Sequence, residues 1–522
     1  MRRVQKLAFL GASALTGPIC VGLYLVFFRS IRYPFGADSA SYIEAARNLK
    51  AGIGLYTTQF DIDLPDQDLV RLTEWPPGFS LLLAGASSLG LDPRVIAPWF
   101  GHVPALVVPV LMMALFRQTI TAPLLLFVGI LVATSPGFLF FQFLALTDLM
   151  FLALAIMSIG LLLGNTRASL HQVVLSGMFA GLAYAVRNVG VALLAALPLS
   201  QLLAYLLKIR GWSRVRRDMV IWVCGAAIFV APLLAFNLAA SGVLQPYKMA
   251  PSTLGLMTNL RAFLAAALGD LFGAHIVGTL AWMWQGLLCI TAANIAIAAA
   301  TMLAWRTMSN DEKYALIVLI AYFAIGSSVV VYARTKYQWG EQISERFAFQ
   351  YSWAILISMM IIGSKYAERP RSRTMTALLL LVIGSGLMGL RIYDVTVFYQ
   401  RIAGTEKQLR WQQNRELITA MEALPPNAFV VSDMGWLFRI ETSRRVRTWP
   451  PLPDDPKALS AALSTLRGGV PKERPIYVLV SSDAAGTARP PSPDNLQSQL
   501  NESGFHIEQT FEIGATLITD AP

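Results

Sequence analysis

Two aspartates stand where carboxylate chemistry at a membrane surface is expected. Asp38 follows the first apolar stretch in the segment ADSASYIEAARNL, and Asp148 begins the apolar run DLMFLAL. An ionisable side chain at membrane depth is costly enough to indicate a function. If the two converge, they form a carboxylate pair, one member of which can act as general base toward a hydroxyl or an amine. The alternative is structural for both: Asp38 as a helix N-cap, and Asp148 as a cap together with Thr147.

Basic residues complete this set of polar side chains, because they fall in or beside connections predicted to share one side of the membrane. Guanidinium groups pair with phosphate through two hydrogen bonds, whereas an ammonium group acts as a point charge. Arg346 is the most suggestive, since SERFAF places it beside Glu345 at the mouth of an apolar stretch. For each residue the alternative is snorkelling toward lipid headgroups. The set comprises Arg187, Lys248, Arg261, Arg334, Lys336 and Arg346.

The sequence assigns no metal site. Four aspartates alternate in FDIDLPDQD, from Asp61 to Asp68, but this run has neither the glycine turn nor the closing glutamate of an EF-hand loop. We interpret them as solvated loop acids. The 3 cysteines lie within apolar stretches, and the 4 histidines form no ligand cluster. Cofactor use is therefore left open, with a divalent metal ion as the one candidate.

Membrane-spanning helices must position these residues. The 522-residue chain is 55% hydrophobic and 14% charged, which is unlike a soluble domain. About eleven apolar stretches have spanning or near-spanning length. They lie near residues 7–28, 95–116, 121–140, 146–164, 172–187, 189–207, 218–239, 277–305, 314–332, 347–364 and 374–391. The pair around Arg187 is the one that a single helix could replace, which would invert the topology of every later span.

Loop charge predicts the orientation. The first span has a basic start, MRRVQK, and is interpreted as an uncleaved signal anchor with a cytoplasmic N-terminus. Lysine and arginine then gather in the even-numbered connections, whereas acids outnumber bases in the 29–94 loop. This distribution follows the positive-inside rule. It accounts for the net charge of +11 without nucleic acid binding.

Two extracytoplasmic regions are expected. The 29–94 loop begins with an amphipathic helix and continues through Glu74 and Trp75 to a Pro-Pro turn. The apolar face of that helix comprises Tyr42, Ala45, Ala46 and Leu49. From about residue 393 the chain is polar, and alternating patterns predict a small α/β domain. Its helices are expected near 406–424, 455–466 and 493–503, and its strands near 428–433, 476–482 and 505–511. The predicted domains are thus a transmembrane domain over 1–392 and an extracytoplasmic domain over 393–522.

These motifs resemble those of the GT-C superfamily of membrane glycosyltransferases, in particular bacterial relatives of protein O-mannosyltransferases and the lipid A aminoarabinose transferase. The resemblance is carried by GADSASYIEAARNL, by EWPPGFSLLLA, by the Thr-Asp pair ending at Asp148, by ERF around Arg346, and by the tail segment LPPNAFVVSDMGWLFRIETSRRVRTWPP. It covers most of the chain in architecture through short, degenerate motifs. One departure is that Gln350 and Tyr351 follow Arg346, where several relatives carry a proline.

The resemblance implies a GT-C-like catalytic transmembrane domain and inverting sugar transfer. Asp38 would be the catalytic base, and Asp148 would be the second acid that orients the acceptor or a metal. Arg346 and the other basic residues would hold the phosphate of a polyprenyl-phosphate sugar, whose leaving charge needs stabilisation. Tyr42, Glu74 and Trp75 would position the acceptor or the loop.

Three functions follow as hypotheses. The leading one is a glycosyltransferase of the bacterial cytoplasmic (inner) membrane, which moves a sugar from a polyprenyl-phosphate donor to a lipid, glycan or protein acceptor of the cell envelope. The second is a transporter or flippase of lipid-linked sugars, although the apolar mid-span positions do not suggest the broken helices of transporters. The third is a membrane scaffold whose C-terminal domain binds a partner.

Overall fold

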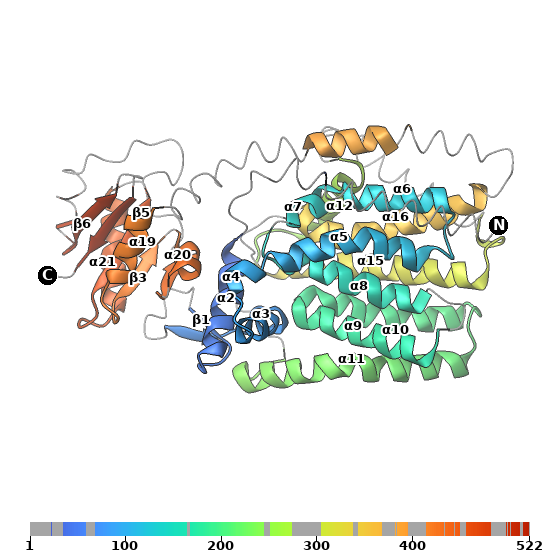
Figure 1. Cartoon of the computed structure of the whole chain (residues 1–522), viewed down its shortest axis with the longest axis horizontal. Helices are drawn as coiled ribbons and strands as arrows, with labels where there is room; N and C mark the ends of the chain where they lie inside the picture. The colour runs from blue at the N-terminus through green and yellow to red at the C-terminus, as the bar shows by residue number, and fades with distance from the viewer. Residues whose placement is uncertain are drawn as a thin grey trace. The chain divides into compact units, whose positions relative to one another are not determined.

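The computed structural model divides the chain into two compact units, each described by itself below (Figure 1). The helical unit comprises Met1–Ser30, Thr73–Phe79 and Pro98–Arg401, and the second unit comprises Ile31–Leu72, Ser80–Ala97 and Ile402–Pro522. The residues that the structure describes are 22, 35–58, 68–142, 144–163, 168–244, 251–273, 304–337, 343–367, 382, 384–394, 414–432, 434–442, 444–448, 456–481, 497, 500–501, 503–511 and 515–520. The predicted spans 7–28 and 277–305 lie almost entirely outside these residues.

Apolar helices form the helical unit. Their bounds are α5 (Trp99–Phe116), α6 (Ala122–Ala133), α7 (Pro136–Phe141), α8 (Asp148–Leu163), α9 (Leu170–Val186), α10 (Val191–Leu206), α11 (Trp212–Ser241), α12 (Leu256–Phe272), α15 (Asn310–Lys336) and α16 (Glu345–Ala367). Within the described residues, 5 helices are long and apolar enough to cross a membrane. The protein is therefore a multi-pass membrane protein, while the count of about eleven spans stays a prediction.

The stretch predicted as one span over 121–140 is two helices. Thr134 closes α6, Ser135 caps α7 by accepting a hydrogen bond from the Phe138 N–H at 3.2 Å, and Pro136 is the first residue of α7. A proline cannot continue a helix that precedes it, because it has no N–H and its ring clashes with the turn before, but it suits a first helical position. The local sequence Thr-Ser-Pro therefore breaks the span.

The segment around Arg187 forms two helices, as the two-span interpretation expects. Arg187 has an extended backbone with φ of −151° and ψ of 129°, which ends α9, and a short 3-10 turn, Asn188–Gly190, leads into α10. The second predicted outer loop, at about 240–276, differs from expectation, because 17 of its residues form α12. This helix packs against α15 and α16, and its residues Phe263, Ala266, Ala267 and Leu271 are buried rather than exposed in a loop.

Small residues bring α9 and α11 together. A Cβ atom built on Gly177 or Gly181 would collide with the α11 backbone, and one on Gly225 would collide with the α9 backbone. Such close approach is the usual basis of helix association in lipid, where the hydrophobic effect between helices is lost. A polar contact adds to it, since the Trp222 indole N–H of α11 donates to the Ser176 hydroxyl of α9 at 3.2 Å. The Ser158 and Ser176 hydroxyls each donate to the other residue's carbonyl oxygen, at 2.8 and 2.7 Å, and so join α8 to α9.

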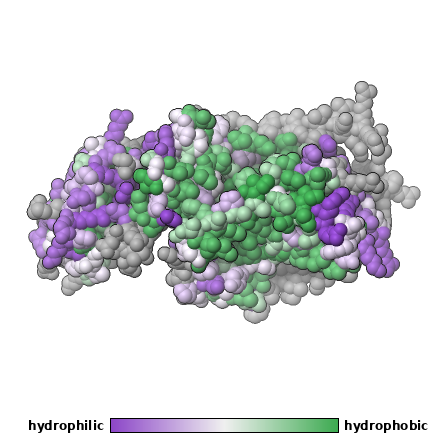
Figure 2. Space-filling view, turned by 90° about the horizontal axis from the view of Figure 1, so that it is seen from below, coloured by the Kyte–Doolittle hydropathy of each residue, from purple (hydrophilic) through white to green (hydrophobic). Residues whose placement is uncertain are grey.

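One face of the helical unit, on the side of α11, is largely apolar (Figure 2). Viewed from the side on which α11 lies in Figure 1, most of the unit is coloured hydrophobic (Figure 2). On α11 alone, Val220, Val223, Ile228 and Leu238 are all about half exposed. Large exposed apolar surfaces of this kind are expected where lipid replaces water.

The second unit contains a sheet and several short helices. They are α2 (Ala37–Lys50), β1 (Tyr56–Thr58), β2 (Leu69–Arg71), most of α3 (Gly78–Ser88), α4 (Pro93–Ile96), α19 (Arg415–Ala423), β3 (Phe429–Ser432), α20 (Gly435–Glu441), β4 (Val446–Thr448), α21 (Pro456–Gly469), β5 (Ile476–Ser481), β6 (His506–Phe511) and β7 (Ala515–Thr519). The strand order of the 5-stranded sheet is β4-β3-β5-β7-β6. Strand β3 is parallel to β4 and β5, and β7 is antiparallel to β5 and β6.

The α/β pattern predicted for the tail is confirmed. Strands β3, β5 and β6 lie where alternating apolar residues predicted them. Alternate residues such as Phe429, Ile476 and Ile518 pack against Leu463 of α21 in one core. Strand β4 was not predicted, because Val446–Thr448 is only three residues long and contains Arg447. Strand β7 and helix α20 were not predicted either.

Candidate functional site

One buried carboxylate lies among three polar side chains at the start of α8. The Asp148 side chain is 0% exposed, and its Oδ2 lies 2.7 Å from Nη1 of Arg187. Its Oδ1 accepts a hydrogen bond from Gln350 Nε2 at 3.0 Å and lies 3.5 Å from Nε of Arg346. Arg187 also contacts the Thr147 hydroxyl, at 3.4 Å. The structure thus brings together three of the residues that the sequence singled out, and adds Gln350.

Helix ends position these groups. Asp148 is the first residue of α8, Arg187 is the extended residue that ends α9, and Arg346 lies in the first turn of α16. Gln350 follows Arg346 by four residues on the same face of α16, and its amide also donates to the Arg346 carbonyl at 3.0 Å. A proline at position 350 could not make these contacts. The departure from the resembled pattern therefore supplies an additional donor to Asp148.

The cluster carries one more positive than negative charge. Arg187 and Arg346 side chains are each 12% exposed, whereas Asp148 is wholly buried between them. The carboxylate acts as a counter-ion that orients two guanidinium groups. Two guanidinium groups side by side suit a phosphate, because they bind oxyanions through paired N–H donors.

The segment before α3 lies beside Arg187. A Cβ atom on Gly78 would collide with the Ala185 carbonyl oxygen, so the backbone of this segment touches the end of α9. The Asn188 side-chain amide donates to the Glu74 carbonyl oxygen at 3.0 Å. Glu74 and the half-buried Trp75 next to it are therefore neighbours of the arginine cluster.

The other predicted basic residues are placed differently. Arg334 is buried, and its Nη1 donates to the Tyr337 carbonyl oxygen at 3.4 Å. The Lys336 ammonium lies 5.6 Å from the centre of the Tyr337 ring. Arg261 is exposed on α12, and Lys248 lies outside the described residues. Their predicted role in holding the donor phosphate stays a prediction.

Asp38 lies in the second unit, in the first turn of α2. The N-cap of this helix is Gly36, so the interpretation of Asp38 as an N-cap is wrong by two positions. Asp38 is half-buried, and Tyr42, one turn further, is 3% exposed. The predicted helix is confirmed, but its residues from Ser39 to Ala46 are all buried, so it does not have the one buried face of an amphipathic helix. The pairing of Asp38 with Asp148 stays a prediction.

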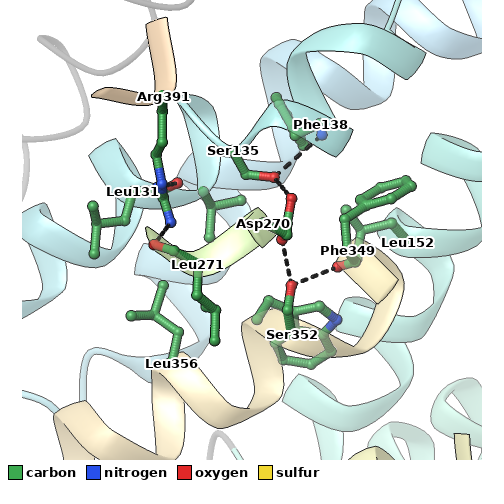
Figure 3. Close-up of a pocket in the computed structure, with 12 residues that line it drawn as sticks. Leu131, Ser135, Phe138, Leu152, Asp270, Leu271, Phe349, Ser352, Leu356 and Arg391 are labelled. Atoms are coloured by element: carbon green, nitrogen blue, oxygen red, sulfur yellow. Dashed lines mark hydrogen bonds between the residues drawn. The ribbon is translucent and has the colours of Figure 1, made fainter. Parts of the chain in front are cut away.

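A second buried carboxylate, which sequence reasoning missed, lies at the end of α12 (Figure 3). Asp270 accepts hydrogen bonds from the Ser135 hydroxyl, from the Gly137 N–H at 3.2 Å and from the Ser352 hydroxyl at 2.5 Å. It borders a cavity of about 10 Å³, which has room for about one water molecule. Because Ser135 and Gly137 belong to the start of α7, Asp270 ties α12 to the α6–α7 break and to α16.

Arg391 lines the same cavity (Figure 3). Its guanidinium donates to the Leu131 carbonyl near the end of α6 and to the Leu271 carbonyl at the end of α12. These carbonyls have no partner within their own helices, because the last turn of a helix leaves its acceptors unpaired. One signal in the sequence was available for both residues: each is a single charge within an otherwise apolar segment, ALGDLF or LMGLRIY.

A metal site does not emerge from these side chains. Within the described residues, no group of three or more histidine, cysteine, aspartate or glutamate side chains could hold a metal ion. Asp148 has two arginines as partners, which disfavours a cation there. The residues that the structure describes thus do not fit a bound metal, and no step below depends on one.

The fold matches solved structures of membrane glycosyltransferases. ArnT from Cupriavidus metallidurans bound to undecaprenyl phosphate superposes with a TM-score of 0.60 at 13% identity, over 98% of this chain and 98% of that one. The archaeal oligosaccharyltransferase AglB from Archaeoglobus fulgidus, in complex with an inhibitory peptide and a dolichol-phosphate, has a TM-score of 0.56 at 13% identity, over 91% and 70%. Arabinofuranosyltransferase AftD from Mycobacteria has a TM-score of 0.58 at 15% identity, over 98% of this chain and 40% of that one.

No protein-family model matches the sequence, and no curated protein matches it significantly. The likeness is therefore one of fold: the chain has the architecture of GT-C membrane glycosyltransferases, as the sequence motifs suggested. ArnT is similar to it over nearly the whole length of both chains.

Proposed function

We propose that this protein is an inverting glycosyltransferase, which takes a sugar from a polyprenyl-phosphate donor. The observation that carries the proposal is the pair of partly exposed arginines that Asp148 holds side by side. That is the charge and the geometry that a lipid-linked phosphate requires. The binding of undecaprenyl phosphate by ArnT and of dolichol-phosphate by AglB supports the same donor class.

In the proposed reaction, Asp38 is the general base. Its carboxylate accepts the proton of the acceptor hydroxyl or amine, whose oxygen or nitrogen forms a bond to the anomeric carbon. The bond between that carbon and the phosphate oxygen breaks at the same time, and its electron pair leaves with the polyprenyl phosphate. Arg187 and Arg346 stabilise the added negative charge on this phosphate, which is where transition-state charge develops.

The remaining assignments are part of the same proposal. The acceptor is a lipid, a glycan or a protein of the cell envelope, and Tyr42, Glu74 and Trp75 help to position it or its loop. Lys248, Arg334 and Lys336 are further candidates for contact with the donor. We place the protein in the bacterial inner membrane, with a cytoplasmic N-terminus, a transmembrane domain over 1–392 and an extracytoplasmic domain over 393–522.

Sugar transfer by purified protein in proteoliposomes tests the proposal. With a radiolabelled polyprenyl-phosphate sugar, Asp38→Asn is expected to lower transfer by about 10²–10⁴-fold, the usual contribution of a general base. The matched control is Asp92→Asn, since Asp92 caps α4 and asparagine caps helices equally well. Full transfer by Asp38→Asn would remove Asp38 as the base. Movement of labelled lipid across the bilayer without covalent transfer would favour the flippase instead.

A further inference from the structure

We propose that Arg439, in the C-terminal part of the second unit, is a positioning residue for Asp38 and acts through Glu44 on the same helix. The inference rests on the proposed role of Asp38 as the base. It assigns the C-terminal part of the second unit a role in the reaction, because Arg439 belongs to α20 whereas Asp38 and Glu44 belong to α2.

A buried ion pair joins the two helices. The Arg439 side chain is 1% exposed, and its Nε and Nη2 lie 2.8 and 2.5 Å from Oε2 of Glu44. Its Nη2 also reaches the Ser41 hydroxyl, at 3.4 Å, and the Thr57 hydroxyl of β1. The guanidinium therefore contacts α2 at two successive turns and contacts β1 as well. A planar donor set of this kind fixes orientation, because all of its N–H groups point in defined directions.

Glu44 is held on its other side by β1. Thr57 Oγ1 donates to Glu44 Oε2 at 2.9 Å, the Thr58 N–H donates to the same oxygen at 3.0 Å, and the Thr58 hydroxyl donates to Oε1. A second contact runs in the opposite direction, since Arg47 of α2 donates to the Arg439 and Ile440 carbonyl oxygens at 3.2 and 3.0 Å. Helix α2 is thus fastened between β1 and α20 at two points.

Helix α20 is itself fixed to the sheet. A Cβ atom on Gly435 would collide with the Arg447 carbonyl oxygen of β4, so the first residue of α20 touches the strand backbone. Strand β4 is the edge strand of the 5-stranded sheet and pairs with β3. The contacts of Gly435, Arg439 and Glu44 therefore fix α2 relative to this sheet, both along the helix axis and in rotation about it.

This arrangement matters for Asp38 because of its place on α2. Ser41 is one turn beyond Asp38, and Glu44 is about one turn beyond Ser41. A rotation or a slide of α2 would move the Asp38 carboxylate with it. A misplacement of about 1 Å at a reacting group costs up to about 10²-fold in rate, so a small loss of fit at Arg439 is expected to reach the chemistry.

Arg439→Lys is the variant that tests the inference. Lysine keeps the charge beside Glu44 but lacks the planar fork, so α2 is held less firmly. We expect kcat for sugar transfer to fall about tenfold to a hundredfold, with KM for the donor unchanged and the melting temperature close to wild type. The control is Arg444→Lys, because Arg444 donates to the carbonyl oxygens of Glu422, Leu424 and Pro425 and not to α2. It should leave kcat unchanged.

A double-mutant cycle with Asp38→Asn separates positioning from a general structural role. If Arg439 acts through Asp38, the double variant transfers sugar at the same residual rate as Asp38→Asn alone. An additional drop of the same factor as in the wild-type background would overturn the inference. So would an unchanged kcat for Arg439→Lys when Asp38→Asn is inactive. Full activity of Asp38→Asn would instead overturn the proposed base.

A variant with a milder change covers the case in which Arg439→Lys does not fold. Arg47→Lys removes the paired contacts to the α20 carbonyls from the α2 side and leaves the ion pair between Glu44 and Arg439 intact. It should lower kcat in the same direction by a smaller factor, again without a change in donor KM. An unaltered kcat in a folded Arg47→Lys protein would count against the positioning role.

Discussion

Two buried carboxylates of the helical unit, Asp148 and Asp270, both contact α16 and yet have opposite partners. Asp148 is neutralised by two arginines that remain 12% exposed. Asp270 is 3% exposed and is bound by two hydroxyls and one backbone N–H, in a cavity with room for about one water molecule. The first cluster contains two partly exposed guanidinium groups, whereas the partners of the second are hydroxyl and backbone groups.

The difference separates a binding cluster from a structural one. A buried carboxylate that satisfies helix ends and serines contributes to the folded state and has no capacity left for a ligand. A carboxylate that orients more positive charge than it can neutralise leaves a site for an anion. Burial and charge at membrane depth are shared by the two residues, so it is the partners that distinguish their roles.

Arg346→Gln is expected to have the largest effect, because it removes one of the two guanidinium groups beside Asp148. We expect sugar transfer to fall by about 10²–10³-fold, the usual cost of removing one charge-stabilising donor. The melting temperature should change little, because Asp148 keeps Arg187 and Gln350 as partners. Transfer assays and thermal unfolding in detergent measure the two effects.

Lys365→Gln is the matched control for Arg346→Gln. Lys365 lies at the other end of α16, where it pairs with Glu312 at 2.7 Å, so the variant removes a charge from the same helix away from the cluster. Its transfer rate should stay within about twofold of wild type. Equal losses in the two variants would mean that charge on α16, rather than its position beside Asp148, governs activity.

Asp148→Asn should affect stability as well as activity. It leaves two arginines without their buried counter-ion, which we expect to cost about 3–5 kcal/mol of unfolding free energy. Affinity for polyprenyl phosphate should fall less than in Arg346→Gln, because both guanidinium groups remain present. Thermal unfolding and titration with the lipid phosphate separate the two. An affinity loss larger than that of Arg346→Gln would refute the counter-ion role.

Asp270→Asn should have a smaller effect, confined to stability. Asparagine retains one carbonyl oxygen for Ser135 and Gly137, and the Ser352 hydroxyl can rotate to accept from the new amide. We expect a loss of about 1 kcal/mol, the net value of one hydrogen bond, and a transfer rate within about twofold per folded molecule. A selective loss of lipid phosphate binding in this variant would place Asp270 with Asp148 and abolish the distinction.

Glu44 extends the comparison to a carboxylate whose partners come from the second unit. Burial alone would raise its pKa, but the charge of Arg439 and the hydrogen bonds from Thr58 outweigh it and hold the pKa below the usual 4.5. The charged form therefore stabilises the fold above about pH 4.5, and this contribution is lost as the pH falls through the lowered pKa.

Thermal unfolding of wild type and Glu44→Gln as a function of pH checks this expectation. The difference in melting temperature should be constant from about pH 7 to 5 and should shrink below pH 4.5, because protonated Glu44 resembles glutamine. A difference that stays constant down to pH 3 would mean that Glu44 does not titrate in this range.

Much of the architecture follows from apolar length and period. Helices α8, α9, α10 and α15 lie close to predicted spans, because a stretch of spanning length in a hydrophobic chain has few alternatives to a helix. The break at Pro136 also had a local signal, Thr-Ser-Pro, which the hydropathy count overrode. Helix α12 was not predicted, because Arg261 and Asp270 interrupt a short apolar segment, which then resembles a loop.

The sequence was enough to predict which charged residues belong to the candidate site, but not which side chains they contact. Asp148, Arg187 and Arg346 stood out as charges at the ends of apolar stretches, and the structure joins them. Gln350 was not predicted as a partner, because a polar residue in an apolar helix has the same sequence signature whether it faces a carboxylate, a serine or lipid. Asp270 had the signal of a single charge in an apolar segment, but that signal does not identify its partners. Arg439 sits in a polar domain, where an arginine carries no signal at all until its burial is known.

The close contact between the glycines of α9 and α11 has a consequence for the assembly of the protein in the membrane. Helix α10 separates α9 from α11 in the chain, so Gly177, Gly181 and Gly225 meet only after all three helices have entered the bilayer. Their association then draws on van der Waals contact and on the hydrogen bond from Trp222 to Ser176, because lipid is as apolar as the side chains it would replace. Arg187 is the residue next after α9. We therefore expect its final position in the membrane to be set only when α9 and α11 associate.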